Sequence, residues 1–186
     1  MSTHILDFWK KNRSFWITPP SKQKVVDKYI SDGFWNYPIQ DETMIGKIIY
    51  FDQFYRHFCR HGLVTEEDVT KHRVAATELV KDNVHMLKEL DDVEIIFAMM
   101  PFKHLKDYDF IFETLHTGWL PAHSGSVSSE SLDFQKFYTD TYKKAFTLDT
   151  VRANLITQHE LTPYDASLIC DSYPAVSYTH LTLPTN

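Results

Sequence analysis

The residues of this chain that are best suited to chemistry lie on two segments that both read as helices. Asp52 and Arg56 are one helical turn apart, with Gln53 beside them, and His104 and Asp107 are three residues apart on a later segment. If these faces meet, Arg56 can bind an anionic group, while Asp52 or Asp107 fixes the tautomer of His104. The same histidine could also act as a general acid or base near neutral pH.

The first segment is predicted to turn its carboxylate toward the protein interior. Asp52 falls inside an apolar stripe at helical spacing, made by Ile45, Ile48, Ile49, Tyr55 and Cys59. A carboxylate in the core is costly unless it is paired or hydrogen-bonded. Because Arg56 follows one turn later, we expect it to pair with Asp52.

A structural role explains the same residues, and the sequence leaves the choice open. Buried Arg–Asp pairs and hydrogen-bonded histidines often hold helices in one register, and removing one partner costs about 3–5 kcal/mol. Such groups mark functional sites only in some proteins. We therefore take Asp52, Gln53, Arg56, His104 and Asp107 as a candidate ligand-binding cluster and assign no catalytic residue.

Other known site patterns are missing from the sequence. His57 and His61 have the spacing of two metal ligands on one helix face, but no third ligand accompanies them in a zinc-type motif. We therefore predict no metal site and interpret both as exposed histidines at a helix end. There is no phosphate-binding loop, dinucleotide fingerprint or nucleophile elbow, so no cofactor is predicted.

Composition narrows the class of protein. The chain has 186 residues, 43% of them hydrophobic and 24% charged, which is typical of a soluble globular protein. The net charge of −6 disfavours a nucleic-acid partner, which would need a basic face. No segment approaches the roughly 18 apolar residues of a membrane span. Cys59 and Cys170 are interpreted as reduced thiols, and we expect a cytoplasmic location with no membrane partner.

Capping residues, glycines and prolines predict a chain of helices. Thr18 can cap a helix that begins at Pro19 and stops at Gly33, and Asp41 can cap the next one. Residues 65–68 resemble a capping box, and Pro101 should break or kink the helix that contains it. The expected helices cover approximately residues 2–12, 19–32, 42–61, 66–90, 93–100, 102–117, 129–146, 149–158 and 163–171.

These helices predict an all-α fold. Almost no alternation of apolar and polar residues is present, and only five glycines occur, so antiparallel helical hairpins are expected, in a tetratricopeptide-like right-handed array or a compact bundle. Residues 1–175 are expected to form one domain. Residues 176–186 resemble translated adaptor sequence, and we interpret them as a non-native or disordered tail on a truncated chain; a genuine short strand is the alternative.

Three segments resemble the all-helical family called domain of unknown function 924. The family has Asp-Phe-Trp near its start, as at residues 7–9, and a Leu-Asp-Gln-Phe-Pro-Arg-Asn helix, which corresponds to residues 51–57. Its Pro-Leu-x-His-Ser-Glu-Asp segment corresponds to residues 101–107. Tyr55 and His57 replace the family's proline and asparagine, while Leu105 and Lys106 replace its serine and glutamate, so the chain resembles a divergent branch of the family. The resemblance implies tetratricopeptide-type hairpins in a family with no established activity.

Two functions from different classes follow. The first is a helical binding or interaction domain whose Asp-Arg-His cluster binds an anionic small ligand or a partner protein. The second is a hydrolase that uses His104, with Asp52, Arg56 and Asp107, for general acid–base chemistry. The sequence leaves open whether the protein is an enzyme.

Overall fold

The chain folds as helices joined by short links, as the spacing of its apolar residues predicts. This computed structural model describes residues 4–123 and 131–145, and within those ranges it contains no β-strand. The prediction of an all-α fold is confirmed, and the tetratricopeptide-like arrangement stays a prediction. The helices expected at 149–158 and 163–171, Cys170 and the tail at 176–186 lie outside the described residues.

The described α-helices are separated by short 3₁₀ and π-helical turns, which carry the label η. In chain order the elements are α1 (His4–Lys11), η1 (Arg13–Phe15), η2 (Pro20–Lys22), α2 (Gln23–Phe34), α3 (Met44–Ile49), η3 (Tyr50–Phe54), α4 (Tyr55–Arg60), α5 (Glu66–Asp82), η4 (Val84–Glu89), α6 (Asp92–His104), α7 (Tyr108–Thr114), η5 (Leu115–Trp119), α8 (Leu120–His123) and α9 (Leu132–Ala145).

The chain divides into two compact units, residues 1–137 and 138–186. In the second unit the structure describes the end of α9, where the rings of Tyr138 and Tyr142 are stacked. The single domain expected over residues 1–175 stays a prediction, because most of the second unit lies outside the described residues. None of the described helices combines the length and the apolar character that crossing a membrane requires.

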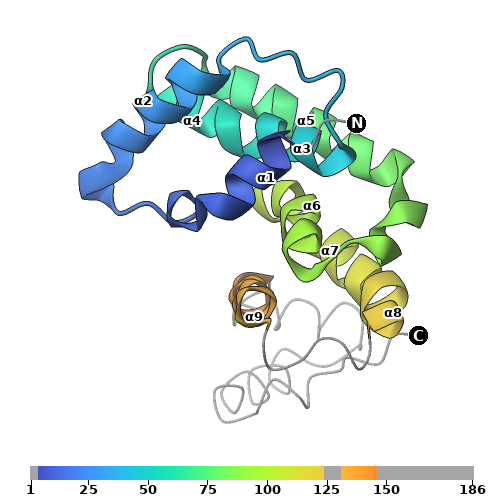
Figure 1. Cartoon of the computed structure of the whole chain (residues 1–186). Helices are drawn as coiled ribbons and strands as arrows, with labels where there is room; N and C mark the ends of the chain where they lie inside the picture. Colours follow the sequence, from blue (N-terminus) through green and yellow to red (C-terminus); the bar gives the residue numbers. More distant parts are fainter. Residues whose placement is uncertain (1–3, 124–130, 146–186) are drawn as a thin grey trace. The chain divides into compact units, whose positions relative to one another are not determined.

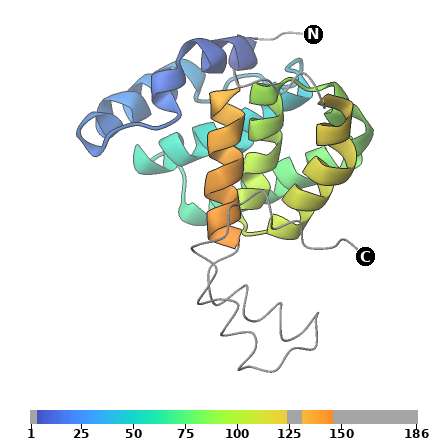
Figure 2. The same ribbon diagram turned by 90° about the horizontal axis from the view of Figure 1, so that it is seen from below.

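A continuous helical segment over residues 44–60, here called the motif helix, is the centre of the first unit. It consists of α3, the π-helical turn η3 and α4. Helices α1 and α6 pack against α3, α2 packs against α4, and α5 contacts all three parts. Figure 1 shows the cyan motif helix between the blue α2 and the green α5, and Figure 2 shows the same helices from below. Its side chains therefore face neighbours on opposite sides.

Large aromatic and aliphatic side chains fill the space around the motif helix. Trp9, Phe54 and Phe58 are fully buried, and the rings of Trp9 and Phe54 meet at 5.5 Å between centroids. Ile95 and Met99 bring the apolar face of α6 to the same core. This apolar packing makes any polar group within it expensive unless that group is hydrogen-bonded.

Some helix ends differ from those predicted. The side chain of Thr43, rather than Asp41, caps the motif helix by accepting the N–H of Gly46 at 3.1 Å. Gly33 lies inside α2, which continues to Phe34. The left-handed backbone conformation expected of Gly33 is adopted instead by Asn36, with a φ of 58°. A polar side chain therefore takes the role that the sequence pattern gave to glycine.

Proline and glycine also fail to interrupt the later helices. Helix α6 continues through Pro101 to His104, so of the predicted break or kink the break is wrong and the kink stays a prediction. Proline removes one backbone hydrogen bond, but Met99, Pro101 and Phe102 are all buried, and their packing offsets that loss. Gly118, which was expected to end a helix, lies inside the π-helical turn η5.

The capping box at residues 65–68 is present as predicted. Thr65 accepts the N–H of Asp68 at 3.2 Å, and Asp68 accepts the N–H of Thr65 at 2.9 Å. We expect Thr65→Ala to lower the free energy of unfolding by about 1 kcal/mol, because one backbone donor loses its partner. Urea denaturation measures the change, and Thr65→Ser, which keeps the hydroxyl, should remain close to wild type. Equal stability of the alanine and serine variants would contradict a role for the cap.

Candidate functional site

The central part of the motif helix is a π-helical turn. The N–H of Tyr55 donates to the carbonyl of Tyr50, five residues earlier, and the turn therefore holds one residue more than an α-helical turn. Asp52 and Gln53, although adjacent in sequence, are both buried in this turn. The wider turn also invalidates the α-helical spacing from which an Asp52–Arg56 pair was predicted. Turns of this kind occur frequently at functional sites.

The carboxylate of Asp52 is 1% exposed and is bonded to three side chains. Its Oδ1 accepts from Nε of Arg73 at 2.8 Å and from Nδ1 of His104 at 2.9 Å, and its Oδ2 accepts from Nε2 of Gln53 at 2.5 Å. Burial alone would raise the pKa of Asp52, but the bonds from His104 and Arg73 outweigh it and lower that pKa below its usual value. Asp52 is therefore an ionised group at neutral pH.

The structure brings four of the five candidate residues together. Arg56 does not pair with Asp52 as expected; its Nη1 lies 3.4 Å from Nε2 of His104. Asp107 lies apart from the cluster and caps α7, where its Oδ1 accepts the N–H of Phe110 at 3.3 Å. An aspartate that starts a helix is well placed for capping, which accounts for this position without any role in the cluster.

Arg73 belongs to the cluster but was missed from the sequence. Its side chain is 15% exposed, and it replaces Arg56 as the cationic partner of Asp52. One signal could have found it: on α5, Arg73 stands in helical register with the buried residues Val69, Ala76 and Val80. A charged residue on a buried stripe requires a buried partner of opposite sign.

A second buried carboxylate lies on the other side of the motif helix. Asp27, on α2, is 3% exposed and accepts from Nδ1 of His57 at 2.7 Å. Arg60 donates from Nε to both oxygens of Asp27, at 3.0 and 3.2 Å, and Gln23 donates from Nε2 at 2.9 Å. Asp27 also lies in register with a buried stripe, formed by Ile30 and Phe34 on α2.

The environment of His57 differs from the expected helix end in solvent. His57 is 4% exposed, so the prediction of an exposed histidine at this position is wrong. Desolvation lowers the pKa of His57 to about 4, although the hydrogen bond to Asp27 acts in the opposite direction. His57 is therefore neutral at pH 7. Donation from His57 to Asp27 requires the tautomer with the proton on Nδ1, and Nη2 of Arg60 then lies 3.0 Å from the same nitrogen without donating to it.

The two clusters have the same composition. Each carboxylate accepts from an arginine Nε, a histidine Nδ1 and a glutamine Nε2, although the residues come from different elements. The first cluster contains Asp52, Gln53, Arg73 and His104; the second contains Asp27, Gln23, Arg60 and His57. Because each glutamine donates through its nitrogen, its side-chain oxygen remains an acceptor for another group.

Two cavities border the motif helix, and Arg56 and Arg60 line both of them. The smaller has a volume of about 210 Å³, and the larger about 390 Å³. The other residues of the smaller cavity are Phe15, Trp16, Ile17, Thr18, Gln23, Gln53 and His57. Those of the larger cavity are Cys59, Glu66, Val69, Arg73 and His104.

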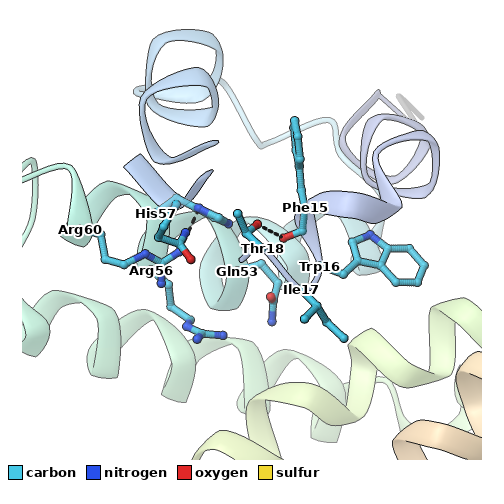
Figure 3. A pocket seen from close by; sticks show the side chains of 9 residues that line it. Phe15, Trp16, Ile17, Thr18, Gln53, Arg56, His57 and Arg60 are labelled. Carbon is cyan, nitrogen blue, oxygen red and sulfur yellow. Dashed lines mark hydrogen bonds between the residues drawn. The ribbon is translucent and has the colours of Figure 1, made fainter. Parts of the chain in front are cut away.

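Figure 3 shows how side chains lie around the smaller cavity. Gln53 and Arg56 extend from the motif helix toward Ile17, while the rings of Phe15 and Trp16 point away from Arg56. The hydroxyl of Thr18 donates to the carbonyl of Phe15 at 3.2 Å, which holds the link between α1 and α2 in place. The groups near Arg56 are therefore mainly polar.

The described residues offer little for metal or thiol chemistry. Among them, no group of three or more histidine, cysteine, aspartate or glutamate side chains could hold a metal ion. Cys59 lines the larger cavity, and its thiol donates to Oε1 of Glu66 at 3.4 Å. Desolvation and the neighbouring Glu66 raise the pKa of Cys59, which keeps it a thiol rather than a nucleophilic thiolate.

Fold and site together define an all-helical protein with two buried Asp–Arg–His–Gln clusters, and its central π-helical turn supplies Asp52 and Gln53 of the first. Comparison of the chain with protein-family models, with curated proteins and with solved structures gave no match.

Proposed function

We propose that this protein binds an anionic small molecule through Arg56. Among the described residues, no carboxylate lies within 4.0 Å of the Arg56 guanidinium, although the group is half-buried. The two nearby aspartates already bind Arg73 and Arg60. Desolvation lowers the pKa of Arg56, which means that its surroundings disfavour the cation. Asp52 and Glu66 attract the cation from a greater distance, but neither forms a direct pair with it. A half-buried guanidinium with no carboxylate within 4.0 Å among the described residues is the observation that carries the proposal.

The surroundings of Arg56 suit an anion. Arg60 and Arg73 also line the cavities, and the guanidinium group can donate two parallel hydrogen bonds to a carboxylate or phosphate. Among the described residues that line the two cavities, Glu66 is acidic and it borders the larger one. Arg60 and Arg73 are paired with Asp27 and Asp52, so Arg56 supplies the unpaired positive charge on these walls, and the arginines outnumber the acidic side chains of the described lining.

Titration with inorganic phosphate tests the proposal. We expect phosphate to raise the melting temperature, because a ligand that binds the folded state stabilises it. In Arg56→Gln the affinity measured by calorimetry should fall about 10-fold or more, as one or two charge-assisted hydrogen bonds are lost.

Lys71→Gln is the matched control, because it removes one positive charge from an exposed position on α5. Its phosphate affinity should equal that of wild type. Equal affinities in Arg56→Gln and Lys71→Gln, or no binding at all, would overturn the assignment of the anion to Arg56.

One observation favours the hydrolase alternative. Asp52 accepts from Nδ1 of His104, which leaves Nε2 as the basic nitrogen, as in Asp–His pairs that serve general base catalysis. However, Nη1 of Arg56 lies 3.4 Å from that nitrogen, where it can donate a hydrogen bond and occupy the lone pair that a general base needs. Binding is therefore our first choice. Hydrolysis of a phosphate ester that wild type performs and His104→Gln does not would favour the enzyme.

We further propose that the chain is a divergent member of the domain of unknown function 924 family, that its helices pair as tetratricopeptide-type hairpins, and that it works in the cytoplasm. The family proposal is supported by the motif at residues 51–57, since Asp52, Gln53 and Arg56 are the motif residues that lie in or beside the first cluster.

A further inference from the structure

The smaller cavity combines positive charge with neutral hydrogen-bond acceptors. Arg56 and Arg60 supply the charge, and among the described residues of its lining no side chain is acidic. The larger cavity contains Glu66, which would repel an anion. The larger cavity also contains Arg73, but that cation already pairs with Asp52. The smaller cavity, whose described lining has no acidic side chain, is therefore the better place for the negative group of a ligand.

Two of the acceptors in the smaller cavity are the side-chain oxygens of the glutamines that donate to the buried aspartates. Gln23 and Gln53 each donate through Nε2, to Asp27 and Asp52 respectively, so their orientation is fixed by a carboxylate. Their Oε1 atoms are left to accept hydrogen bonds at the cavity wall. Thr18 uses its proton on the carbonyl of Phe15, and its oxygen likewise remains an acceptor.

The hydrogen-bond acceptors beside Arg56 and Arg60 restrict the chemical class of ligand that the smaller cavity can bind. The negative group of the ligand needs hydrogen-bond donors from the protein, which Arg56 and Arg60 supply. The rest of the ligand must itself donate hydrogen bonds to the acceptors on the cavity wall. Hydroxyl groups meet this need without adding positive charge beside the arginines, whereas an ammonium group would be repelled by them. The rings of Phe15 and Trp16 line the same cavity but point away from Arg56.

We propose that the smaller cavity binds the phosphate monoester of a small polyhydroxy compound, a sugar phosphate in chemical class. The phosphate contacts Arg56 and Arg60, and the hydroxyl groups donate to the side-chain oxygens of Gln23, Gln53 and Thr18. This inference depends on the proposed anion binding at Arg56 and adds to it both the cavity and the class of ligand.

Calorimetric titration of the whole chain with three probes tests this assignment: glucose 6-phosphate, ethyl phosphate and inorganic phosphate. The first two carry the same phosphate ester charge, but ethyl phosphate lacks hydroxyl groups. We expect glucose 6-phosphate to bind about 10-fold or more tightly than ethyl phosphate, since several hydrogen bonds distinguish them. Equal affinities would overturn the ligand class while leaving anion binding at Arg56 intact.

Two variants test the placement. Gln23→Leu should reduce the advantage of glucose 6-phosphate over ethyl phosphate, because one of the three proposed acceptors for its hydroxyl groups is lost. Glu66→Gln removes the acidic group of the larger cavity and should change the affinity for any of the probes by less than about 2-fold. A strong gain of phosphate affinity in Glu66→Gln would place the phosphate in the larger cavity and overturn the proposal.

The comparison of probes on wild type does not depend on any variant, so the ligand class is tested even if Gln23→Leu is poorly folded. Failure of the proposed function has a different signature. In that case none of the three probes binds, or Arg56→Gln binds all of them as wild type does.

Discussion

Replacement of Asp52 by alanine is expected to lower the free energy of unfolding by about 3–5 kcal/mol. The carboxylate is 1% exposed and accepts from Arg73, His104 and Gln53. Without it, the half-buried cation of Arg73 and the Nδ1–H of His104 lose their acceptor and cannot be fully rehydrated. Urea denaturation followed by circular dichroism measures the loss.

Asp32→Ala provides the matched control, because the Asp32 carboxylate is 60% exposed and pairs with Lys28 on the surface of α2. A surface pair of this kind contributes little, so we expect a change within about 0.5 kcal/mol. The double variant Asp52→Leu with Arg73→Met should be more stable than Asp52→Ala, because it leaves no stranded cation. Near-wild-type stability of Asp52→Ala would contradict the role of Asp52 as the centre of a buried cluster.

The free energy of unfolding should also fall as the pH is lowered, because His57 becomes protonated. The pKa of His57 is about 4 in the folded protein and 6.5 in its ordinary state, so protonation favours the unfolded chain. The stability that this residue gives is fully present above pH 6.5 and is lost as the pH falls toward 4. The expected loss over this window is about 3 kcal/mol, from the difference between the two pKa values.

Urea denaturation at several pH values between 6.5 and 4.5 measures this dependence. His57→Gln keeps a hydrogen-bond donor for Asp27 but cannot titrate, so its stability should vary much less with pH. His61→Gln, which changes an exposed histidine one turn later, should follow the wild-type curve. A wild-type slope in His57→Gln would show that other groups cause the pH dependence.

Part of this structure follows from the sequence by physical rules. The all-α fold is predictable because apolar residues recur at helical spacing, and the start of α5 is predictable because Thr65 and Asp68 form a capping box. Asp52 was found because a carboxylate on an apolar stripe requires partners, whereas Gln53 was chosen as its neighbour and His104 as part of an i,i+3 pair with Asp107 in a segment that resembles a family motif. The break at Pro101 was predicted wrongly, because local rules for proline do not include the packing of Met99 and Phe102.

The partners in the site were harder to predict. Arg73 and Asp27 also lie on buried stripes, and the test that found Asp52 would have found them if it had been applied to every helix. Asp52 pairs with Arg73 rather than Arg56 because of the way the helices pack against one another. The spacing of residues along one helix gives no information about that packing. The π-helical turn adds a second obstacle, because the pairing rule assumes α-helical geometry throughout.

The wide turn at Tyr50–Phe54 makes the direction of the downstream side chains depend on the length of the segment. Removing a single residue from it would restore the ordinary helical pitch and rotate everything after it by about 100° about the axis. Arg56, His57 and Arg60 would then swing to other faces, and each would lose its present neighbours. Over evolution, this stretch should accept exchanges of one side chain for another far more readily than a deletion.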